Sequence, residues 1–370
     1  MKKIIYLLIL SLVLCGCTKE TQNTQNENTE EIIAVAEGSS STSYRTIVSN
    51  IGTDTREIFN TVFSSNQIDA TKIGRGLELI SLDYFSVDDY YMKESEHMTY
   101  KIQTEETGDY FHIMKRPDVY EETSIQPWSD DIVDGVDSCV MFASLYAVDF
   151  YKSSSNGYEF GGMAITAVIN PDYTDSDTGI TTTYSEETIQ SYAKAAIPKI
   201  YKYYSTESKY TELSTLPILI MVYEKASATD VYDGRYLYSC YCSNGSVGEI
   251  KDVNQHTYVF ASDAASKADS TTASEFVLFR SKLKEASVDS VGVVATGEYF
   301  EGTIQSMTIE VNAVFKVYDE YKAIGQYIAQ LLNDGAFSEN FEIKVKLNNN
   351  AQTIGIIIKE KDGKASFYML

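Results

Sequence analysis

Gly161-Gly162-Met163-Ala164-Ile165-Thr166-Ala167-Val168-Ile169 is an apolar run whose length and β-branched side chains predict a buried strand. A turn-rich loop, residues 170–183, follows it, and a helix is expected from about Ser185. Apolar side chains repeat at helical spacing along one face of that helix: Ile189, Tyr192, Ala196, Ile200 and Tyr203. Pro198 should kink or divide the helix, because proline cannot donate the backbone hydrogen bond of a helix interior.

A hairpin is predicted after this helix. Pro217 to Tyr223 is a second apolar run and indicates a buried strand. A turn at Asp233-Gly234 then leads into a return strand over residues 236–242. The order of elements in this part of the chain is therefore strand, helix, hairpin.

The same order recurs near the end of the chain. Residues 307–315 predict a strand, and a helix is expected from about Asp319 to a C-cap at Gly335. Its inward face is Tyr321, Ile324, Ile328 and Leu331. Residues 341–347 and 353–359 read as the two strands of a hairpin that turns at three asparagines. We therefore predict an α+β fold with a duplicated strand-helix-hairpin unit, mostly antiparallel sheets and helices packed on one face.

Each unit has a lead-in. In the second unit, Thr272-x-x-Glu275 is a capping box that opens a helix, and residues 290–296 predict the next strand. That helix should turn three side chains inward: Phe276, Phe279 and Leu283. In the first unit, residues 77–91 begin with a helical stripe and residues 138–150 read as a strand.

The N-terminus has the pattern of a lipoprotein signal peptide. Residues 1–3 are positive and residues 4–14 are apolar, which is shorter than the roughly 20 residues that span a bilayer. Leu14-Cys15-Gly16-Cys17 then forms a lipobox, with small residues before the scissile bond as the lipoprotein signal peptidase requires. The pattern predicts cleavage after Gly16 and attachment of diacylglycerol to the thiol of Cys17.

The predicted domain organisation follows from this anchor. One acyl chain gives only marginal membrane binding, so a diacylated or triacylated Cys17 would supply stable attachment. Residues 17–43 are rich in Thr, Gln, Asn, Glu and Ser, and predict a disordered tether. Two α+β repeat domains are expected beyond it, over residues 44–243 and 244–370. The expected location is the extracytoplasmic face of a cell membrane.

Composition restricts the partners. The formal net charge is −23 at pH 7, and no basic patch of the kind that binds nucleic acid is present. The expected partners are the membrane, through the lipid anchor, and the lipoprotein processing enzymes.

Three cysteines follow the tether: Cys139, Cys240 and Cys242. Cys240 and Cys242 should face one side of a strand. They are either small buried hydrophobes or, for Cys139 and one of the other two, a disulfide.

Candidate chemistry after the tether is sparse, so we assign no catalytic residue, metal ligand or cofactor. The histidines, His97, His112 and His256, lack the i, i+4 spacing of a helical metal site. An acidic loop from Asp175 approaches an EF-hand pattern but has glycine where a ligand is wanted. A second acidic cluster contains Asp130, Asp131, Asp134 and Asp137. Trp128 is either an edge-of-core aromatic or a stacking surface for a ligand.

Several blocks, taken in order, resemble the CamS family of Gram-positive sex-pheromone precursor lipoproteins. They are residues 76–80 (GLELI), 85–91 (FSVDDYY), 159–165 (EFGGMAI), 216–223 (LPILIMVY), 258–264 (YVFASDA) and 276–331. The resemblance implies a duplicated domain. It also implies a short pheromone cut from the signal sequence, here about residues 10–16 (LSLVLCG), in which Cys15 departs from the usual small, unreactive residue.

Two classes of function are therefore weighed. The first is a cell-surface lipoprotein. Its body is non-catalytic and binds a ligand that the sequence does not identify, and its signal fragment acts as a conjugation pheromone. The alternative is an extracytoplasmic enzyme or a peptide- or wall-binding module. Convergence of the histidines and acidic loops in one pocket would favour the enzyme.

Overall fold

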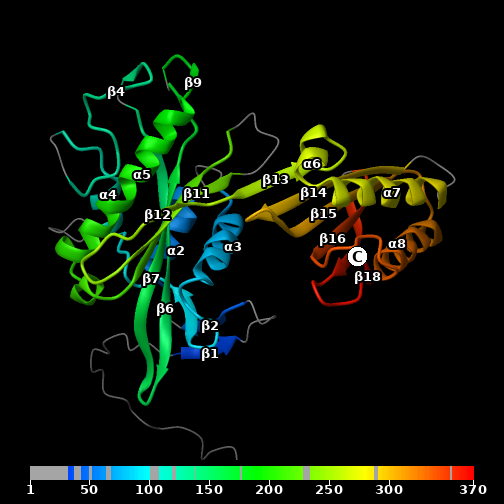
Figure 1. Cartoon of the computed structure of the whole chain (residues 1–370), viewed down its shortest axis with the longest axis horizontal. Helices are drawn as coiled ribbons and strands as arrows, with labels where there is room; N and C mark the ends of the chain where they lie inside the picture. Colours follow the sequence, from blue (N-terminus) through cyan, green and yellow to red (C-terminus); the bar gives the residue numbers. More distant parts are fainter. Residues whose placement is uncertain are drawn as a thin grey trace, which may run out of the picture.

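The computed structural model has an α+β fold with mostly antiparallel sheets, as the sequence predicts (Figure 1). The structure describes residues 32–36, 43–49, 52–63, 68–100, 108–118, 122–137, 139–175, 177–227, 234–286, 291–350 and 352–370. Each of two lobes is built on one large sheet with its own apolar core. The predicted signal peptide, with Gly16 and Cys17, lies outside the described residues.

The first sheet has eight strands in the order β1-β2-β3-β6-β7-β10-β11-β12. Their bounds are β1 (Ile32–Ala36), β2 (Arg45–Ser49), β3 (Tyr90–Glu94), β6 (Phe142–Ser154), β7 (Gly157–Ile169), β10 (Ile218–Glu224), β11 (Arg235–Cys242) and β12 (Ile250–Asp252). Two small hairpins stand apart: β4 (Ile132–Val133) with β5 (Val136–Asp137), and β8 (Asp172–Thr174) with β9 (Thr181–Thr183).

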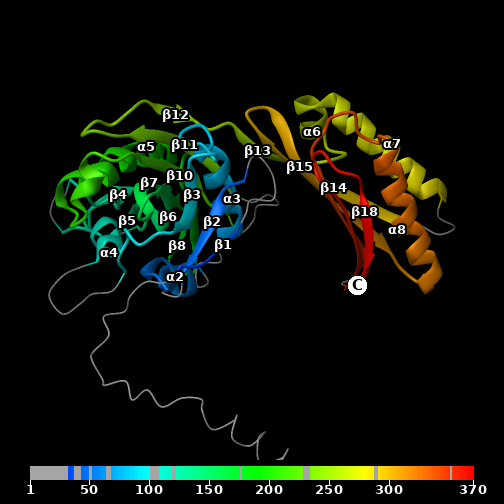
Figure 2. The ribbon, with the colours of Figure 1, turned by 90° about the horizontal axis from the view of Figure 1, so that it is seen from below.

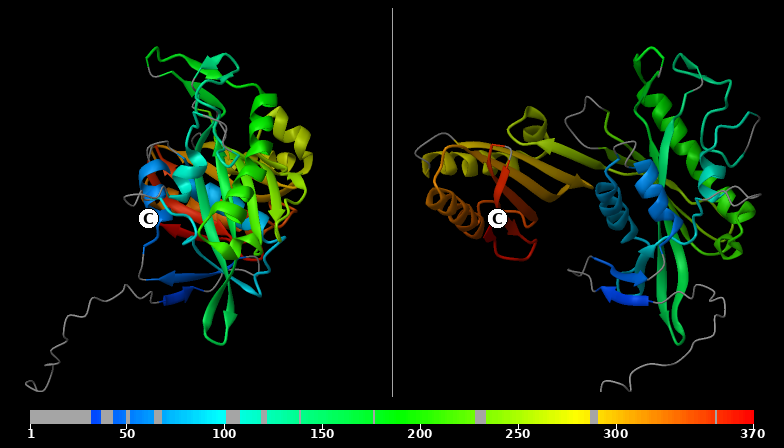
Figure 3. Two further views of the ribbon diagram at one scale, coloured as in Figure 1. Left: turned by 90° about the vertical axis from the view of Figure 1, so that its left-hand side faces the viewer. Right: turned by 180° about the vertical axis from the view of Figure 1, so that it is seen from behind.

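The helices of the first lobe cover this sheet. They are α2 (Asp54–Ile58), the π-helix η1 (Phe59–Phe63), α3 (Ala70–Ser81), α4 (Asp109–Met114), α5 (Glu186–Lys202), the π-helix η2 (Tyr203–Glu207) and the 3₁₀-helix η3 (Thr211–Ser214). Figures 2 and 3 show α3 and α5 on opposite sides of the central strands. Every residue of β10 from Ile218 to Tyr223 is therefore buried.

The central crossover explains the apolar run at residues 161–169. β7 forms a long antiparallel hairpin with β6 and then connects through α5 to β10, which pairs with it in parallel. The hydroxyl of Ser185 accepts the Thr188 N–H and so starts α5 where the sequence predicts. Pro198 does not divide the helix, since α5 continues through it to Lys202 before the π-helical turn. A kink at Pro198 stays a prediction.

The second sheet has six strands in the order β13-β14-β15-β16-β17-β18, covered on one face by α7 and α8 (Figure 2). The strands are β13 (Gln255–Val259), β14 (Val291–Phe300), β15 (Thr303–Ala313), β16 (Glu342–Asn349), β17 (Gln352–Lys359) and β18 (Ser366–Met369). The helices are α6 (Asp263–Ala268), α7 (Ser270–Ala286) and α8 (Tyr318–Asn333). β15 and β16 pair in parallel across α8. The order strand, helix, hairpin thus occurs in both lobes, while its origin by duplication stays a prediction.

Several boundaries of elements and domains differ from those that the sequence predicts. Ile32–Ala36 pairs with β2 as an edge strand, so the predicted disordered tether over 17–43 is wrong for these residues. Isoleucine and valine favour strands, and β2 offers them a free edge. The turn-rich loop after β7 contains the hairpin β8–β9. The first sheet extends to Asp252 and the second begins at Gln255, beyond the predicted division after residue 243.

The predicted capping box at Thr272 is also wrong. Asp269 caps α7, because its carboxylate accepts the Thr272 N–H (2.9 Å) and the helix already begins at Ser270. The inward face is confirmed, since Phe276, Phe279 and Leu283 are buried. Likewise α3 begins at Ala70, seven residues before the apolar stripe, where Asp69 accepts two backbone N–H groups.

Charged side chains join the two lobes. Lys72 and Arg75 lie on α3 of the first lobe, and the ammonium of Lys72 is 3.5 Å from the Glu298 carboxylate on β14. The Arg75 guanidinium lies 3.8 Å from Glu298 and 3.5 Å from Glu342 on β16. These groups are between 30% and 44% exposed, so the ion pairs are solvated and weak.

Candidate functional site

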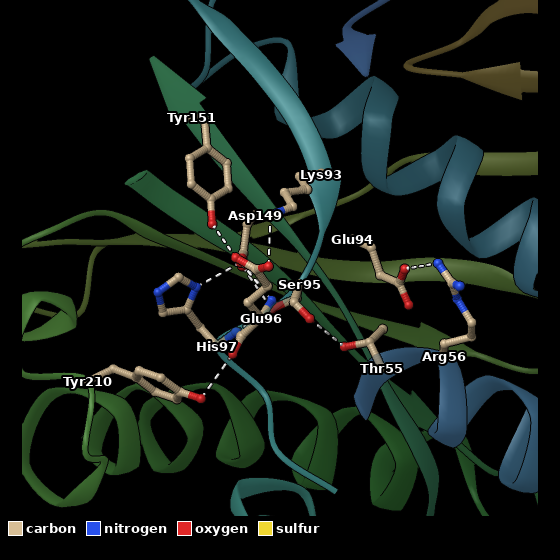
Figure 4. Close-up of polar contacts among 10 residues, drawn as sticks. All are labelled: Thr55, Arg56, Lys93, Glu94, Ser95, Glu96, His97, Asp149, Tyr151 and Tyr210. Atoms are coloured by element: carbon tan, nitrogen blue, oxygen red, sulfur yellow. Dashed lines mark hydrogen bonds and ion pairs between the residues drawn. The ribbon is translucent and has the colours of Figure 1, made fainter. Parts of the chain in front are cut away.

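The most deeply buried acidic side chain that the structure describes is Asp149, which is 0% exposed in the first lobe. Its Oδ1 accepts a hydrogen bond from the Ser95 hydroxyl (2.8 Å). Its Oδ2 is 2.8 Å from the donating Glu96 N–H and 2.7 Å from His97 Nδ1 (Figure 4). A buried carboxylate is tolerated only when donors surround it, and these three supply that requirement.

Two strands place these groups together. β3 pairs antiparallel with β6, so that Lys93 lies opposite Asp149, and β3 ends one residue later at Glu94. Ser95 to His97 then leaves the strand and folds over the carboxylate, with the Thr55 hydroxyl donating to the Ser95 carbonyl (3.1 Å). The end of one strand therefore forms the donor set for an acid on its neighbour.

His97 is enclosed by aromatic rings and acids. Its ring stacks on Phe160 at 3.7 Å and meets Tyr210 edge-on at 4.8 Å between centroids. Its Nε2 lies 3.7 Å from a carboxylate oxygen of Glu212 on η3. Burial lowers the pKa of His97, but the hydrogen bond and charge of Asp149, aided by nearby glutamates, outweigh burial and raise that pKa above its ordinary value.

Glu96 extends the cluster toward the surface. Its carboxylate accepts hydrogen bonds from the Lys93 ammonium (2.7 Å) and the Tyr151 hydroxyl (2.9 Å), while its carbonyl accepts from the Tyr210 hydroxyl (2.9 Å). Lys93 is only 4% exposed. The cluster thereby joins β3, β6 and the segment before η3 through charged and hydroxyl groups.

The order of the groups decides what the cluster can do. A serine protease-like triad needs the serine hydroxyl on the histidine nitrogen that is remote from the acid. Here the Ser95 hydroxyl donates to Asp149 itself, and His97 Nε2 faces Glu212. The geometry supports a structural role in which protonation of His97 strengthens the packing of the cluster, because a protonated His97 would lie between two carboxylates.

A second histidine lies in a separate cluster. His112 Nε2 on α4 is 3.1 Å from the Thr123 hydroxyl and 3.3 Å from the Glu207 carboxylate. Its ring packs on Tyr203, whose hydroxyl donates to the buried Asp109 (2.6 Å). These contacts attach α4 to η2.

The third histidine and the acidic loops lie elsewhere. His256 is on β13, where burial and then the charge of Arg235 lower its pKa. Asp175 accepts the Thr178 N–H and hydroxyl, each at 2.7 Å, and so holds its own turn. Asp134 accepts from Ser185 and Thr188 at the start of α5. Across the described ranges, no group of three or more His, Cys, Asp and Glu side chains is arranged to hold a metal ion.

The remaining candidates are placed as follows. Cys139, Cys240 and Cys242 are all buried free thiols, so the disulfide alternative is not formed in this structure. Cys240 Sγ and Cys242 Sγ lie 3.6 Å apart, which confirms that they share a face of β11. Trp128 is 40% exposed in a loop, where its backbone N–H donates to the Asp131 carboxylate.

Sequence reasoning missed Asp149 altogether. Its partner His97 is 52 residues away in the chain, and no spacing rule joins them. One signal was available: Asp149 is the single charged residue in the run Ala147-Val148-Asp149-Phe150-Tyr151. An acid within a buried strand needs donors from a neighbouring element.

Comparison with known proteins places the chain in a family. Residues 53–365 match the family model described as CamS sex pheromone cAM373 precursor. The chain belongs to the CamS family. The cluster around Asp149 lies within the matched residues, and so do both sheets except for β1, β2 and β18. A comparison with curated protein sequences gives no match.

Two solved CamS-like structures share the fold. The sex pheromone precursor from Lactobacillus salivarius subsp. salivarius UCC118 has a TM-score of 0.74 at 19% identity, covering 92% of this chain and 99% of that one. The C-terminal domain of the sex pheromone staph-cAM373 precursor from Staphylococcus aureus has a TM-score of 0.62 at 15% identity, covering 81% and 96%. At these identities the likeness concerns the fold. No described helix is long and apolar enough to cross a membrane.

Proposed function

We propose that this CamS protein is a lipoprotein precursor that is cleaved after Gly16 and held by lipid on Cys17 at the extracytoplasmic face of the cell membrane. The lipobox Leu14-Cys15-Gly16-Cys17 is the observation that carries the proposal. Its partners at this stage are the membrane and the lipoprotein processing enzymes. The diacylglycerol group alone supplies the two acyl chains that stable anchoring requires, and further acylation would add a third.

Metabolic labelling tests the anchor. Cells that express the chain are fed an alkyne-tagged fatty acid, and the purified protein is analysed by mass spectrometry. We expect label on a chain that begins at Cys17, and a Cys17→Ser variant without label that leaves the membrane fraction. A Cys15→Ser variant is the matched control and should be labelled normally. An unlabelled wild-type chain would refute the anchor.

The second part of the proposed function concerns the signal fragment. Residues 10–16 of the released signal peptide are proposed to act as a conjugation pheromone, which is supported by membership in a family of pheromone precursors. The fragment carries no charged side chain, and such a peptide can leave a membrane and enter an apolar receptor site. Synthetic peptide is added to recipient cells with a responsive conjugative plasmid. An increase in transfer is expected, and no response at any concentration would exclude it.

The body is proposed to be a non-catalytic module. The clusters around His97 and His112 support this proposal. The Nδ1 and Nε2 atoms of His97 lie next to the carboxylates of Asp149 and Glu212, and His112 Nε2 lies next to the Thr123 hydroxyl and the Glu207 carboxylate. Purified mature chain is incubated with fluorogenic ester, peptide and glycan substrates. We expect no turnover. Turnover that disappears in His97→Gln would instead favour the enzyme.

A further inference from the structure

A half-open apolar groove runs between α7 and α8 on the second lobe, where the two helices lie side by side on the sheet (Figure 1). Its lining is Leu283 and Ala286 from α7, Val291 from β14, and Ala323, Ile324 and Tyr327 from α8. The cavity volume is ≈ 350 Å³. That volume lies within the ~300–1,000 Å³ of ordinary ligand pockets.

Exposed apolar side chains lie next in the chain to Lys316, which lines this groove. Phe315 and Val317 lie between β15 and α8 and Tyr318 begins α8, and they are 94%, 65% and 61% exposed. Phe315 also has a φ of 59°, a backbone conformation that a bulky residue adopts only at a local cost. A strained turn that exposes a phenylalanine one residue before the groove-lining Lys316 has the features of a binding site.

We propose that this groove binds the chain's own released segment, residues 10–16, as an extended peptide. This inference rests on the proposed function of that segment. In an extended chain, side chains two residues apart share a face, so Leu10, Leu12 and Leu14 form one apolar stripe. Ser11 falls on the opposite side. The stripe offers three leucine side chains to the apolar lining, while the backbone remains accessible to water.

Charge complementarity favours this occupant over others. The free peptide has one positive and one negative terminus, and Lys316 and Glu320 place one charge of each sign at the groove. A second copy of this chain would bring another net charge of −23 and be repelled. An anionic membrane surface would be repelled for the same reason. A peptide without charged side chains avoids that repulsion.

Calorimetric titration tests the inference with the mature chain from residue 17, carrying Cys17→Ser so that no detergent is needed. The probe is synthetic LSLVLCG under reducing conditions. We expect saturable one-to-one binding. A peptide of the same composition with Ser11 and Leu12 exchanged should bind at least roughly tenfold more weakly, because the exchange breaks the leucine stripe.

Two variants locate the site. Ala323→Trp fills the groove from an exposed position on α8 and should weaken binding by roughly tenfold or more. Ala268→Trp, at an exposed position at the end of α6 outside the groove, is the matched control and should bind normally. Circular dichroism verifies that both variants fold.

The outcomes separate this inference from the proposed function. Absence of peptide binding, or binding that Ala323→Trp leaves intact, overturns the groove assignment. So does a dimer of the wild-type chain in sedimentation that Ala323→Trp dissociates. A peptide that stimulates recipients but does not bind the body leaves the pheromone proposal standing and refutes this one. A peptide that binds the groove and is inactive in recipients leaves the groove assignment standing and refutes the pheromone proposal.

Discussion

Replacing Asp149 with alanine removes the acceptor for three buried donors: the Ser95 hydroxyl, the Glu96 N–H and His97 Nδ1. Asp149 is 0% exposed, so water cannot replace the lost contacts. Breaking a buried ion pair by removing one partner costs about 3–5 kcal/mol in free energy of unfolding. We therefore expect Asp149→Ala to destabilise the first lobe by about 4 kcal/mol.

Asparagine at the same position separates charge from hydrogen bonding. The amide oxygen can accept from Glu96 and His97, and the amide N–H₂ can donate to the Ser95 hydroxyl. The negative charge of the carboxylate is lost, and the loss falls chiefly on the contact to His97, the one partner of the three that can carry a positive charge. Hydrogen bonds to charged groups exceed neutral ones by about 1–2 kcal/mol, so Asp149→Asn should cost about half as much as alanine or less.

The assay uses a natural reporter. Trp128 is the only tryptophan in the chain and lies in the first lobe, so its fluorescence in urea follows the lobe that contains Asp149. With a urea dependence of about 3 kcal/mol per molar, the midpoint of Asp149→Ala should fall by roughly 1 M. The matched control, Asp177→Asn, alters an exposed turn and should leave the midpoint unchanged. A midpoint for Asp149→Ala equal to that control would refute the reasoning.

Three further changes have defined outcomes. Because the folded pKa of His97 is raised, its stabilisation is complete below the ordinary value of about 6.5 and is lost as pH rises through the raised value. The Trp128 urea midpoint should fall over that window in the wild type, and a parallel fall in His97→Gln would contradict this. Gly325→Ala places a Cβ 2.3 Å from the Phe367 ring and should cost about 1–3 kcal/mol of second-lobe stability by calorimetry, partly restored by adding Phe367→Ala. Arg75→Ala breaks solvated ion pairs and should cost less than about 1 kcal/mol in low-salt urea unfolding, with no difference in 1 M salt, where a persistent loss would show a packing role.

Hydrophobic pattern predicted the elements that bury apolar side chains. The run at residues 161–169 is continuously apolar, the helix from Ser185 has a 3.6-residue period and the hairpin at residues 341–359 has a two-residue period, and each forms as predicted. The α+β class follows from those elements. The parallel pairing of β15 with β16 could not be predicted in the same way, because it depends on how α8 crosses the sheet.

Boundaries failed where two local signals competed. Thr272 and Glu275 satisfy a capping box, but Asp269 lies three residues earlier and its carboxylate takes the Thr272 N–H instead. Pro198 predicted a kinked or divided helix, yet tertiary packing of Ala196, Ile197 and Ile200 against the core keeps α5 undivided across it. A nearby acidic residue therefore decided the first case, and packing against other elements decided the second.

The candidate site was the least predictable part. The histidines were identified as chemically interesting, but their partners come from distant elements: Asp149 from β6, and Glu212 from η3. Nothing in the spacing of residues 95–97 indicates that they fold over an acid on the next strand. Register between β3 and β6 determines that meeting, and single-sequence patterns do not specify register between strands far apart in the chain.

If the chain is anchored through Cys17 as proposed, the edge strand β1 has a mechanical consequence. From Cys17 to Ile32 the chain reaches at most about 50 Å, so the body stays close to its anchor. β1 pairs only with β2 among the described strands, through the pairs from Ile32↔Ser49 to Ala36↔Thr46. A pull on the anchor loads these pairs first, and they peel apart in succession. Their release would extend the connection between Cys17 and the folded body to roughly 95 Å while both cores stay folded, so that in an anchored chain β1 would unpair before either core unfolds.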